Sequence, residues 1–199
     1  MINRNRLKLL TNPEFTLLGT EVEQHIESWI TTSNPAETAG LLDEVCLGVL
    51  SRVYKRIGGS EGTVWLASPE SDALVAVFNS GPNADDIVGF RQPVGSGIIS
   101  MVYAQQQPYC ENEISSKAGH DDTLDRQTHQ STRAMVAVPF YFAFGLRGVI
   151  SCVQLHEPGG PEPSGFESSD VEKMVRAGNN VERLVNGKLL SVALGFDEN

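Results

Sequence analysis

The sequence of 199 residues has no apolar run that approaches the roughly 18 residues of a membrane-spanning helix. Its start, MINRNRLKLLTNPEF, has basic residues, but its apolar segment is very short and no cleavage-like site follows. The length suits one domain of ordinary size with short extensions. We therefore expect a cytoplasmic protein that does not bind a membrane.

Cysteine is scarce and its spacing shows no motif. Cys46, Cys110 and Cys152 form an odd number of widely separated thiols, without a C-x-x-C pair. This pattern suits reduced thiols in a cytosolic protein and argues against a scaffold held together by disulfides.

Positive charge is also scarce, because the net charge is −10 at neutral pH. The N-terminal residues Arg4, Arg6 and Lys8 make a basic tail, so the rest of the chain is still more acidic. Nucleic-acid binding draws most of its affinity from neutralising phosphates. The composition therefore predicts no nucleic-acid partner.

Recognised nucleotide and hydrolase motifs are missing. Gly95-Ser96-Gly97 has neither the lysine of a P-loop nor the third glycine of a dinucleotide fingerprint, so a tight turn is expected there. No serine, histidine and aspartate stand at the spacing of a known catalytic triad motif.

A polar stretch offers groups that suit divalent metals, but its spacing matches no ligand motif. These groups are His120, Asp121, Asp122 and His129. A solvated polar loop is the favoured interpretation, and no metal site is predicted.

Helical periodicity is strong at both ends of the chain. From Phe15 to Ile30 the large apolar residues recur at steps of three and four, which predicts an amphipathic helix. A second helix is predicted from the N-cap Asn34, with Glu37 completing a capping box, up to the glycine pair at 58–59. A last helix is predicted to open with the capping box Ser169-x-x-Glu172.

Between these helices the period changes to that of strands. Residues 62–68 and 73–80 predict a hairpin, 97–106 a short helix and PYCEN a short strand, whereas 113–133 have no clear period. Residues 131–157 read STRAMVAVPFYFAFGLRGVISCVQLHE, a hairpin that is apolar on both faces. Antiparallel sheets usually keep one face wet, so both sides of this hairpin must be covered.

Three of these segments, in this order, resemble the GAF domain family of small-molecule sensors over residues from about 36 to about 194. They are VGSGIISMVYAQQQPYCENE, TRAMVAVPF and GLRGVISCVQL. The resemblance implies an α+β fold with a central antiparallel sheet of five or six strands and the N- and C-terminal helices on one face. A short helix at 97–106 and a long loop at 112–132 would cover a ligand pocket on the other face.

The family pattern is not matched throughout. Its glycine-x-x-glycine is Gly97-x-x-Ser100 here, and Ala134 stands where a serine or similar small residue is often found. The asparagine-lysine-phenylalanine-aspartate-glutamate signature of some cyclic-nucleotide-binding members is absent, which disfavours that ligand.

The resemblance also divides the chain. Residues 1–33 would form an N-terminal tail and a helix used for dimerisation, 34–195 the GAF-like domain including its C-terminal helix, and 196–199 a tail. The ligand-binding residues predicted on this basis are Phe90, Ile98, Tyr109, Asp121, Arg126, His129 and Arg133. Arg126, His129 and Arg133 would donate hydrogen bonds from the loop to an anionic or carbonyl-bearing ligand.

The function implied is that of a non-enzymatic sensory or regulatory domain that binds a small molecule of unknown identity. One alternative is a thiol-dependent reductase like the free methionine sulfoxide reductases, which place cysteines beside the glycine-opened helix and in the long loop. Those segments, GSGIIS and KAGHDDTLDRQTHQ, contain none here, and no cation near Cys110 is placed to lower its pKa. Another alternative is a dimerising scaffold without a ligand.

Two macromolecular partners are expected. The first is a second copy of the chain, because both terminal helices carry incomplete a/d seams, although each stripe also suits packing on its own sheet. These seams are Phe15, Leu18, Val22, His25 and Trp29, and Val171, Met174, Gly178, Val181 and Val185. The second is a separate output protein, since no output segment follows the last predicted helix.

Overall fold

The computed structural model describes residues 13–114, 123–128, 130–156 and 159–193. Its elements are α1 (Pro13–Thr32), α2 (Pro35–Ala39), α3 (Glu44–Arg56), β1 (Glu61–Ala67), β2 (Ala73–Asn79), α4 (Ala84–Ile87), β3 (Arg91–Pro93), α5 (Gly97–Gln105), β4 (Tyr109–Glu111), α6 (Thr123–Thr128), β5 (Thr132–Phe142), β6 (Gly145–Leu155) and α7 (Ser168–Ala193). Within these ranges, no helix combines the length and apolar character that crossing a bilayer requires.

The strands form one sheet of six in the order β3-β2-β1-β6-β5-β4. Every neighbouring pair is antiparallel. Both predicted hairpins, β1–β2 and β5–β6, and the short strand β4 are confirmed. The sheet therefore matches the antiparallel arrangement of five or six strands that the sequence predicted.

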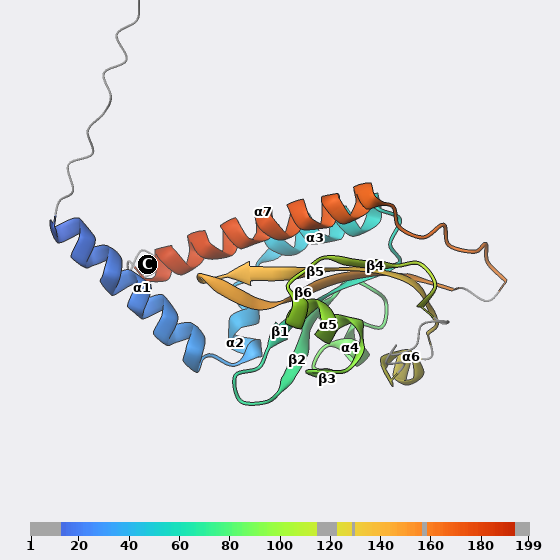
Figure 1. The fold of residues 1–199 in the computed structure, drawn as a ribbon, viewed down its shortest axis with the longest axis horizontal. Helices are drawn as coiled ribbons and strands as arrows, with labels where there is room; N and C mark the ends of the chain where they lie inside the picture. The colour runs from blue at the N-terminus through green and yellow to red at the C-terminus, as the bar shows by residue number, and fades with distance from the viewer. Residues whose placement is uncertain (1–12, 115–122, 129, 157–158, 194–199) are drawn as a thin grey trace, which may run out of the picture.

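Side chains of β5 pack alternately on the two sides of this sheet. Val136 and Val138 belong to a core cluster beneath α3 and α7, whereas Ala137 and Met135 belong to or pack against a second cluster beneath α5. Figure 1 shows α3 and α7 on one side of the sheet and α4, α5 and α6 on the other. The expectation that this hairpin is covered on both faces is confirmed.

The long helix α7 covers β5 with the residues of its predicted a/d seam. Met174, Val181 and Val185 are buried, and a Cβ atom at Gly178 would lie 3.9 Å from Val138 Cγ2. This part of α7 therefore packs on the sheet of its own chain, which was the alternative to a dimer contact for this apolar stripe.

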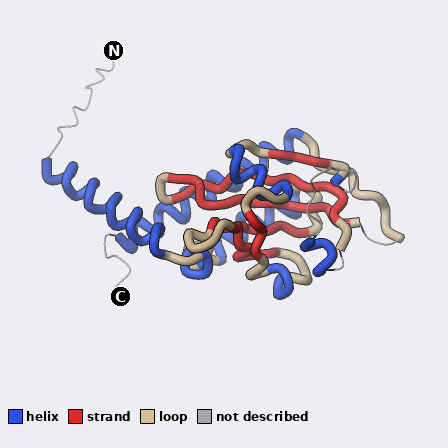
Figure 2. The backbone as a smooth tube through the Cα atoms, turned by 60° about the horizontal axis from the view of Figure 1, so that its bottom comes forward, coloured by secondary structure: helices blue, strands red, loops and turns tan. Residues whose placement is uncertain are grey.

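The first helix joins this layer only through its C-terminal half. Ile26 and Ile30 are buried in the core under α7, whereas Leu17 is 65% exposed. Figures 1 and 2 show α1 extending away from the sheet.

The single helix predicted after Asn34 is two helices. The capping box is confirmed, because Glu37 N–H donates to Asn34 Oδ1 at 2.9 Å and Asn34 N–H donates to Glu37 Oε2 at 3.0 Å. However, α2 ends at Ala39, and α3 starts anew behind Asp43, whose Oδ1 accepts from Cys46 N–H at 2.9 Å. The prediction of one continuous helix is therefore wrong, because Asp43 caps the start of a second helix.

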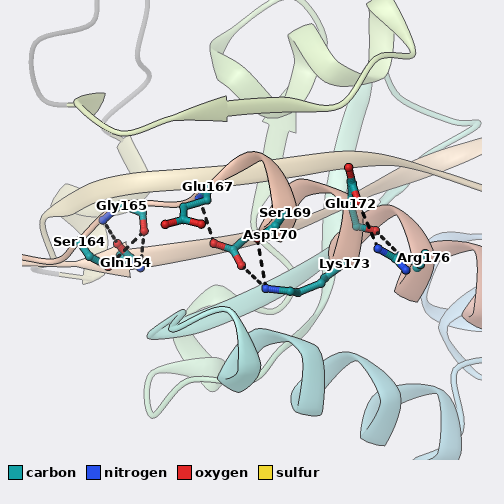
Figure 3. Close-up of polar contacts among 9 residues, drawn as sticks. All are labelled: Gln154, Ser164, Gly165, Glu167, Ser169, Asp170, Glu172, Lys173 and Arg176. Atoms are coloured by element: carbon teal, nitrogen blue, oxygen red, sulfur yellow. Dashed lines mark hydrogen bonds and ion pairs between the residues drawn. The ribbon is translucent and has the colours of Figure 1, made fainter.

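The start of α7 also differs from the predicted capping box Ser169-x-x-Glu172. The helix begins at Ser168, and the N–H of Glu167 donates to Asp170 Oδ2 at 2.9 Å. Glu172 instead pairs with Arg176 at 3.2 Å, one turn further on (Figure 3). Asp170 therefore supplies the carboxylate at the helix start.

Two glycines and two side-chain hydrogen bonds determine the turn before α5. Gly95 and Gly97 have φ angles of 99° and 73°, in the left-handed region that glycine adopts without strain. Ser100 Oγ donates to Pro93 O at 2.7 Å, and Gln92 Nε2 donates to Ser96 O at 3.0 Å. The predicted tight turn is confirmed, whereas α4 and β3 were not predicted.

Candidate functional site

A small chamber lies between the sheet and its second helical layer. It encloses about 60 Å³, enough for about four water-sized groups. The strands β1, β5 and β6 contribute its floor, and α5 and α6 contribute its roof. The polar lining residues are Glu61, Thr63, Gln92, Asp125, Gln130, Thr132 and Ser151; the others are Trp65, Gly97, Ile98, Ile99, Leu124, Met135 and Val153.

Glu61 is the most buried charged group of the chamber, at 4% exposed. It stands at the first position of β1, where the strand alternation directs Glu61, Thr63 and Trp65 to the chamber side. Its Oε1 accepts from Asn79 Nδ2 and its Oε2 accepts from Gln130 Nε2, both at 3.3 Å. Neutral amides therefore hold this carboxylate.

Two hydroxyl groups complete the polar floor. Ser151 Oγ accepts from the indole Nε1 of Trp65 at 3.0 Å, across the β1–β6 ladder. Thr63 Oγ1 accepts from Asn79 Nδ2 at 3.0 Å. Each hydroxyl also has a proton of its own to donate.

The roof helix α6 is fastened to β5 through a second carboxylate. Asp125 accepts from the backbone N–H of Thr132 at 2.8 Å and from its hydroxyl at 2.7 Å. Gln130 N–H donates to Asp125 O at 2.9 Å. The same short segment thus positions Asp125 and the amide of Gln130 beside the chamber.

The predicted ligand-binding residues are only partly brought together. Ile98 lines the chamber, and Phe90 packs edge-on against Trp65 with ring centroids 6.4 Å apart. Tyr109 packs against the core cluster that contains Trp65, with its hydroxyl 3.2 Å from Glu111 Oε2. All three residues therefore belong to or pack against the cluster on the chamber side of the sheet.

The two predicted arginine donors are not among the described residues that line the chamber. Arg133 pairs with Glu162 at 3.4 Å and borders a separate surface hollow with His156. Arg126 is exposed on α6. Asp121 and His129 lie outside the described residues, so their predicted roles stay predictions.

The residues Glu61, Thr63, Ser151 and Gln130 were not predicted as site residues. The first strand was predicted to begin at Gly62, which left out Glu61 and obscured the alternation Glu61, Thr63, Trp65. Ser151 was passed over because it lies within an otherwise apolar strand, although it falls on the face of Val149 and Val153. The signal that could have been used was the pair of polar residues Glu61 and Thr63 at alternate positions of β1.

The cysteines lie away from the chamber. Cys46 and Cys152 are buried in the core under α3 and α7. Burial raises the pKa of the Cys46 thiol to about 11 and raises that of Cys110, which stands on β4. Across the part of the chain that the structure describes, no group of His, Cys, Asp and Glu side chains is arranged to hold a metal ion.

A second hollow lies on the outer surface between α3 and α7. Val49, Val53 and Ala177 are among the residues that line it. Arg52, Arg56, Lys173 and Arg176 are its charged lining. It is therefore a basic groove on a chain whose overall charge is negative.

Comparison with known proteins gives matches in structure alone. No protein-family model and no curated protein matches the sequence. Similar solved structures include the GAF domain of a phosphoenolpyruvate-protein phosphotransferase from Coxiella burnetii, with a TM-score of 0.60 and 14% identity over 90% of this chain and 98% of that one.

A free methionine-R-sulfoxide reductase from Neisseria meningitidis, solved with its substrate, is similar with a TM-score of 0.58 and 16% identity over 92% of this chain and 98% of that one. The GAF domain of a sensor histidine kinase from Bacillus halodurans has a TM-score of 0.53 and 9% identity over 72% of this chain and 95% of that one. At such identities the likeness concerns the fold. The chain has a GAF-like fold.

Proposed function

We propose that this chain is a non-enzymatic sensory or regulatory domain that binds a small molecule in the chamber. The observation that carries the proposal is the chamber itself, where strands and roof helices bring buried polar groups together beneath α5 and α6. A few convergent polar groups in a pocket are a common feature of ligand-binding sites. Similar structures include a domain of a sensor kinase, which agrees with this role.

The main alternative is a thiol-dependent reductase, because a methionine sulfoxide reductase shares the fold. Such chemistry needs a thiolate, which a lowered pKa provides. The thiol pKa values of Cys46, Cys110 and Cys152 are all raised, chiefly by burial, and none of these residues lines the chamber. We therefore favour the binding function. Free thiols also suit the cytoplasm as the site of action.

A further candidate is a dimerising scaffold without a ligand, and the small volume of about 60 Å³ favours it. The buried Glu61 argues against it, because an apolar side chain there would avoid the cost of taking a carboxylate out of water.

The strand β5 offers a route from the chamber to the terminal helix. Thr132 and Met135 line the chamber, whereas Val136 and Val138 belong to the core that contains the buried face of α7. A ligand that moves β5 therefore changes the surface on which α7 packs. We propose that the signal leaves through the terminal helices, to a second copy or to a separate output protein.

The test is an unbiased ligand search by thermal shift and native mass spectrometry across metabolites, nucleotides and haem. It compares the wild type with Val153→Phe, which places a ring in the chamber, and with Val45→Phe, a matched change on a side chain that is 60% exposed. We expect a compound that raises the Tm of the wild type and of Val45→Phe but not of Val153→Phe. Compounds that act equally on all three proteins, or no compound at all, would contradict the proposal.

A further inference from the structure

The charged residues that line the chamber are all acidic. Glu61 and Asp125 contribute carboxylates, and no Lys, Arg or His is among the described residues around the space. Asp125 uses its oxygens on the backbone and hydroxyl of Thr132 at 2.8 and 2.7 Å. Among the described lining residues, Glu61 is therefore the carboxylate whose negative charge is left to be balanced.

Glu61 is incompletely compensated within the described part of the chain. Hydrogen bonds from cations to carboxylates are about 2.7–2.9 Å long, whereas the two amides that contact Glu61 are both at 3.3 Å and carry no charge. Two carboxylate oxygens accept about four hydrogen bonds, so acceptor positions remain. A buried carboxylate at 4% exposure calls for a cation beside it.

The position of this carboxylate is built into the fold. A Cβ atom at Gly81 would overlap Glu61 Oε2, so only glycine leaves the room that the side chain occupies. Gly81 N–H donates to Asn79 Oδ1 at 2.6 Å, and Asn79 in turn donates to Glu61. The loop after β2 thus holds both the amide and the space for the acid.

We infer that the chamber takes a small primary ammonium compound, with Glu61 as its counterion and the hydroxyls of Thr63 and Ser151 as its neutral polar contacts. An ammonium group donates three hydrogen bonds, which suits the free acceptor positions of a carboxylate. The space suits about four non-hydrogen atoms, the size of an amino alcohol or the head of a longer amine. This inference rests on the proposed function, because it names the ligand class of the same chamber.

The inference replaces the anionic or carbonyl-bearing ligand that the sequence suggested. That expectation relied on Arg126, His129 and Arg133 as donors. Arg133 borders another hollow and pairs with Glu162, and His129 lies outside the described residues. An anion in the chamber would instead face the Glu61 carboxylate, and like charges repel.

The experiment measures the Tm with four probes: ethanolammonium chloride, ethylene glycol, sodium acetate and potassium chloride, at matched ionic strength. The proteins are the wild type, Glu61→Gln and the control Glu70→Gln, which removes one exposed carboxylate outside the chamber. Gly81→Ala is a further variant, which keeps the charge of Glu61 but displaces the carboxylate, and Val153→Phe is included as the variant that fills the chamber.

We expect ethanolammonium alone to raise the Tm of the wild type and of Glu70→Gln in a saturable way, by roughly 3–6 °C at ten times its Kd. Glu61→Gln and Gly81→Ala should bind at least about tenfold more weakly. Without any probe, Glu61→Gln should be no less stable than the wild type, because it removes a buried charge that lacks a cation.

An undiminished response in Glu61→Gln would overturn the inference, as would an equal response to potassium chloride. Stabilisation by acetate or ethylene glycol, abolished by Val153→Phe, would overturn the ammonium class but support ligand binding in the chamber. If all four probes fail, the inference falls, and the metabolite search described above decides the proposed function separately.

Discussion

At the scale of single residues, Tyr54 shows how close packing and polar satisfaction compete. Its ring is 2% exposed and lies against β1 at Gly62, where a Cβ atom would collide with it. Among the described residues, its hydroxyl is the buried side-chain polar atom without a hydrogen-bond partner. Close packing has therefore been achieved here at the expense of one hydrogen bond.

This arrangement predicts that Tyr54→Phe raises the free energy of unfolding by about 1 kcal/mol, because it removes a buried group that lost its water. Chemical denaturation measures the change. Tyr141→Phe is the control, since its hydroxyl donates to Gln106 Oε1 at 3.2 Å and its removal brings no such gain. A loss of stability in Tyr54→Phe would show that the hydroxyl has a partner.

Features that depend on one or two residues close in sequence were predicted correctly. Asn34 and Glu37 form the expected capping box, and Gly97 has the positive φ that its turn requires. Glu61 was missed because a glutamate at a strand end is normally solvated. Its burial depends on Asn79, Gln130 and Gly81, which are brought to it only by the folded chain.

At the scale of elements, the N-terminal cap of α3 connects two helices. Asp43 accepts from Cys46 N–H and pairs with Lys188 of α7 at 2.9 Å. The backbone hydrogen bond from Cys46, followed by the contact with Lys188, lowers the pKa of Asp43 from 3.8 to about 2. Its charged form is therefore favoured in the folded state.

A carboxyl group whose pKa is lowered by folding stabilises the fold at pH values above its pKa in the unfolded chain. This contribution is lost as the pH falls toward 2. We predict that wild type loses stability more steeply between pH 4 and pH 2 than Asp43→Asn does. Asparagine keeps the cap but does not titrate. Urea denaturation at a series of pH values measures the two curves, and parallel curves would contradict the assignment.

Elements whose apolar residues recur with a clear period were predictable, whereas elements that depend on tertiary contacts were not. The β5–β6 hairpin was found from its two apolar faces, and α7 from its long stripe. The break between α2 and α3 was missed because the apolar stripe from Leu42 continues smoothly after the cap at Asp43. Similarly, α4 and β3 are too short for a period and depend on their contacts with β2.

At the scale of the whole molecule, exposed apolar side chains occur at the ends of both terminal helices and at the β5–β6 turn. Leu17 is 65%, Phe144 69%, Leu190 46% and Val192 54% exposed. Ala143 N–H donates to Asn186 Oδ1 at 2.8 Å, which fixes the turn to α7 one helical turn before Leu190. These exposed apolar side chains support the proposed homodimer, since each copy would present the same residues.

For a homodimer through these side chains, Leu190→Asp should shift the population from dimer to monomer, because it introduces charge into an apolar contact. Sedimentation velocity over a range of concentrations measures the change. Val88→Asp is the matched control, since Val88 is 47% exposed next to α4, away from the terminal helices. A wild type that is monomeric at all concentrations, or equal effects of both variants, would contradict the dimer.

The overall architecture was predictable because its order of helices, hairpins and glycine-opened helix is distinctive. The character of the chamber was not, because its polar lining comes from β1, β5, β6 and the segment around α6, which are distant in sequence. Among the predicted residues that the structure describes, Ile98 is the one that lines the chamber directly. The folded arrangement alone shows that the chamber is small and acidic.

The central claim is that ligands bind between the sheet and the roof formed by α5 and α6. Trp65 lines that space, and the chain has two tryptophans, so Trp29→Phe leaves Trp65 as the only indole fluorophore. The most direct measurement is the emission of this variant during titration with each compound that raises its Tm. We predict a saturable change in Trp65 emission with the same Kd as the thermal shift, whereas stabilising compounds that leave this emission unchanged would contradict the claim.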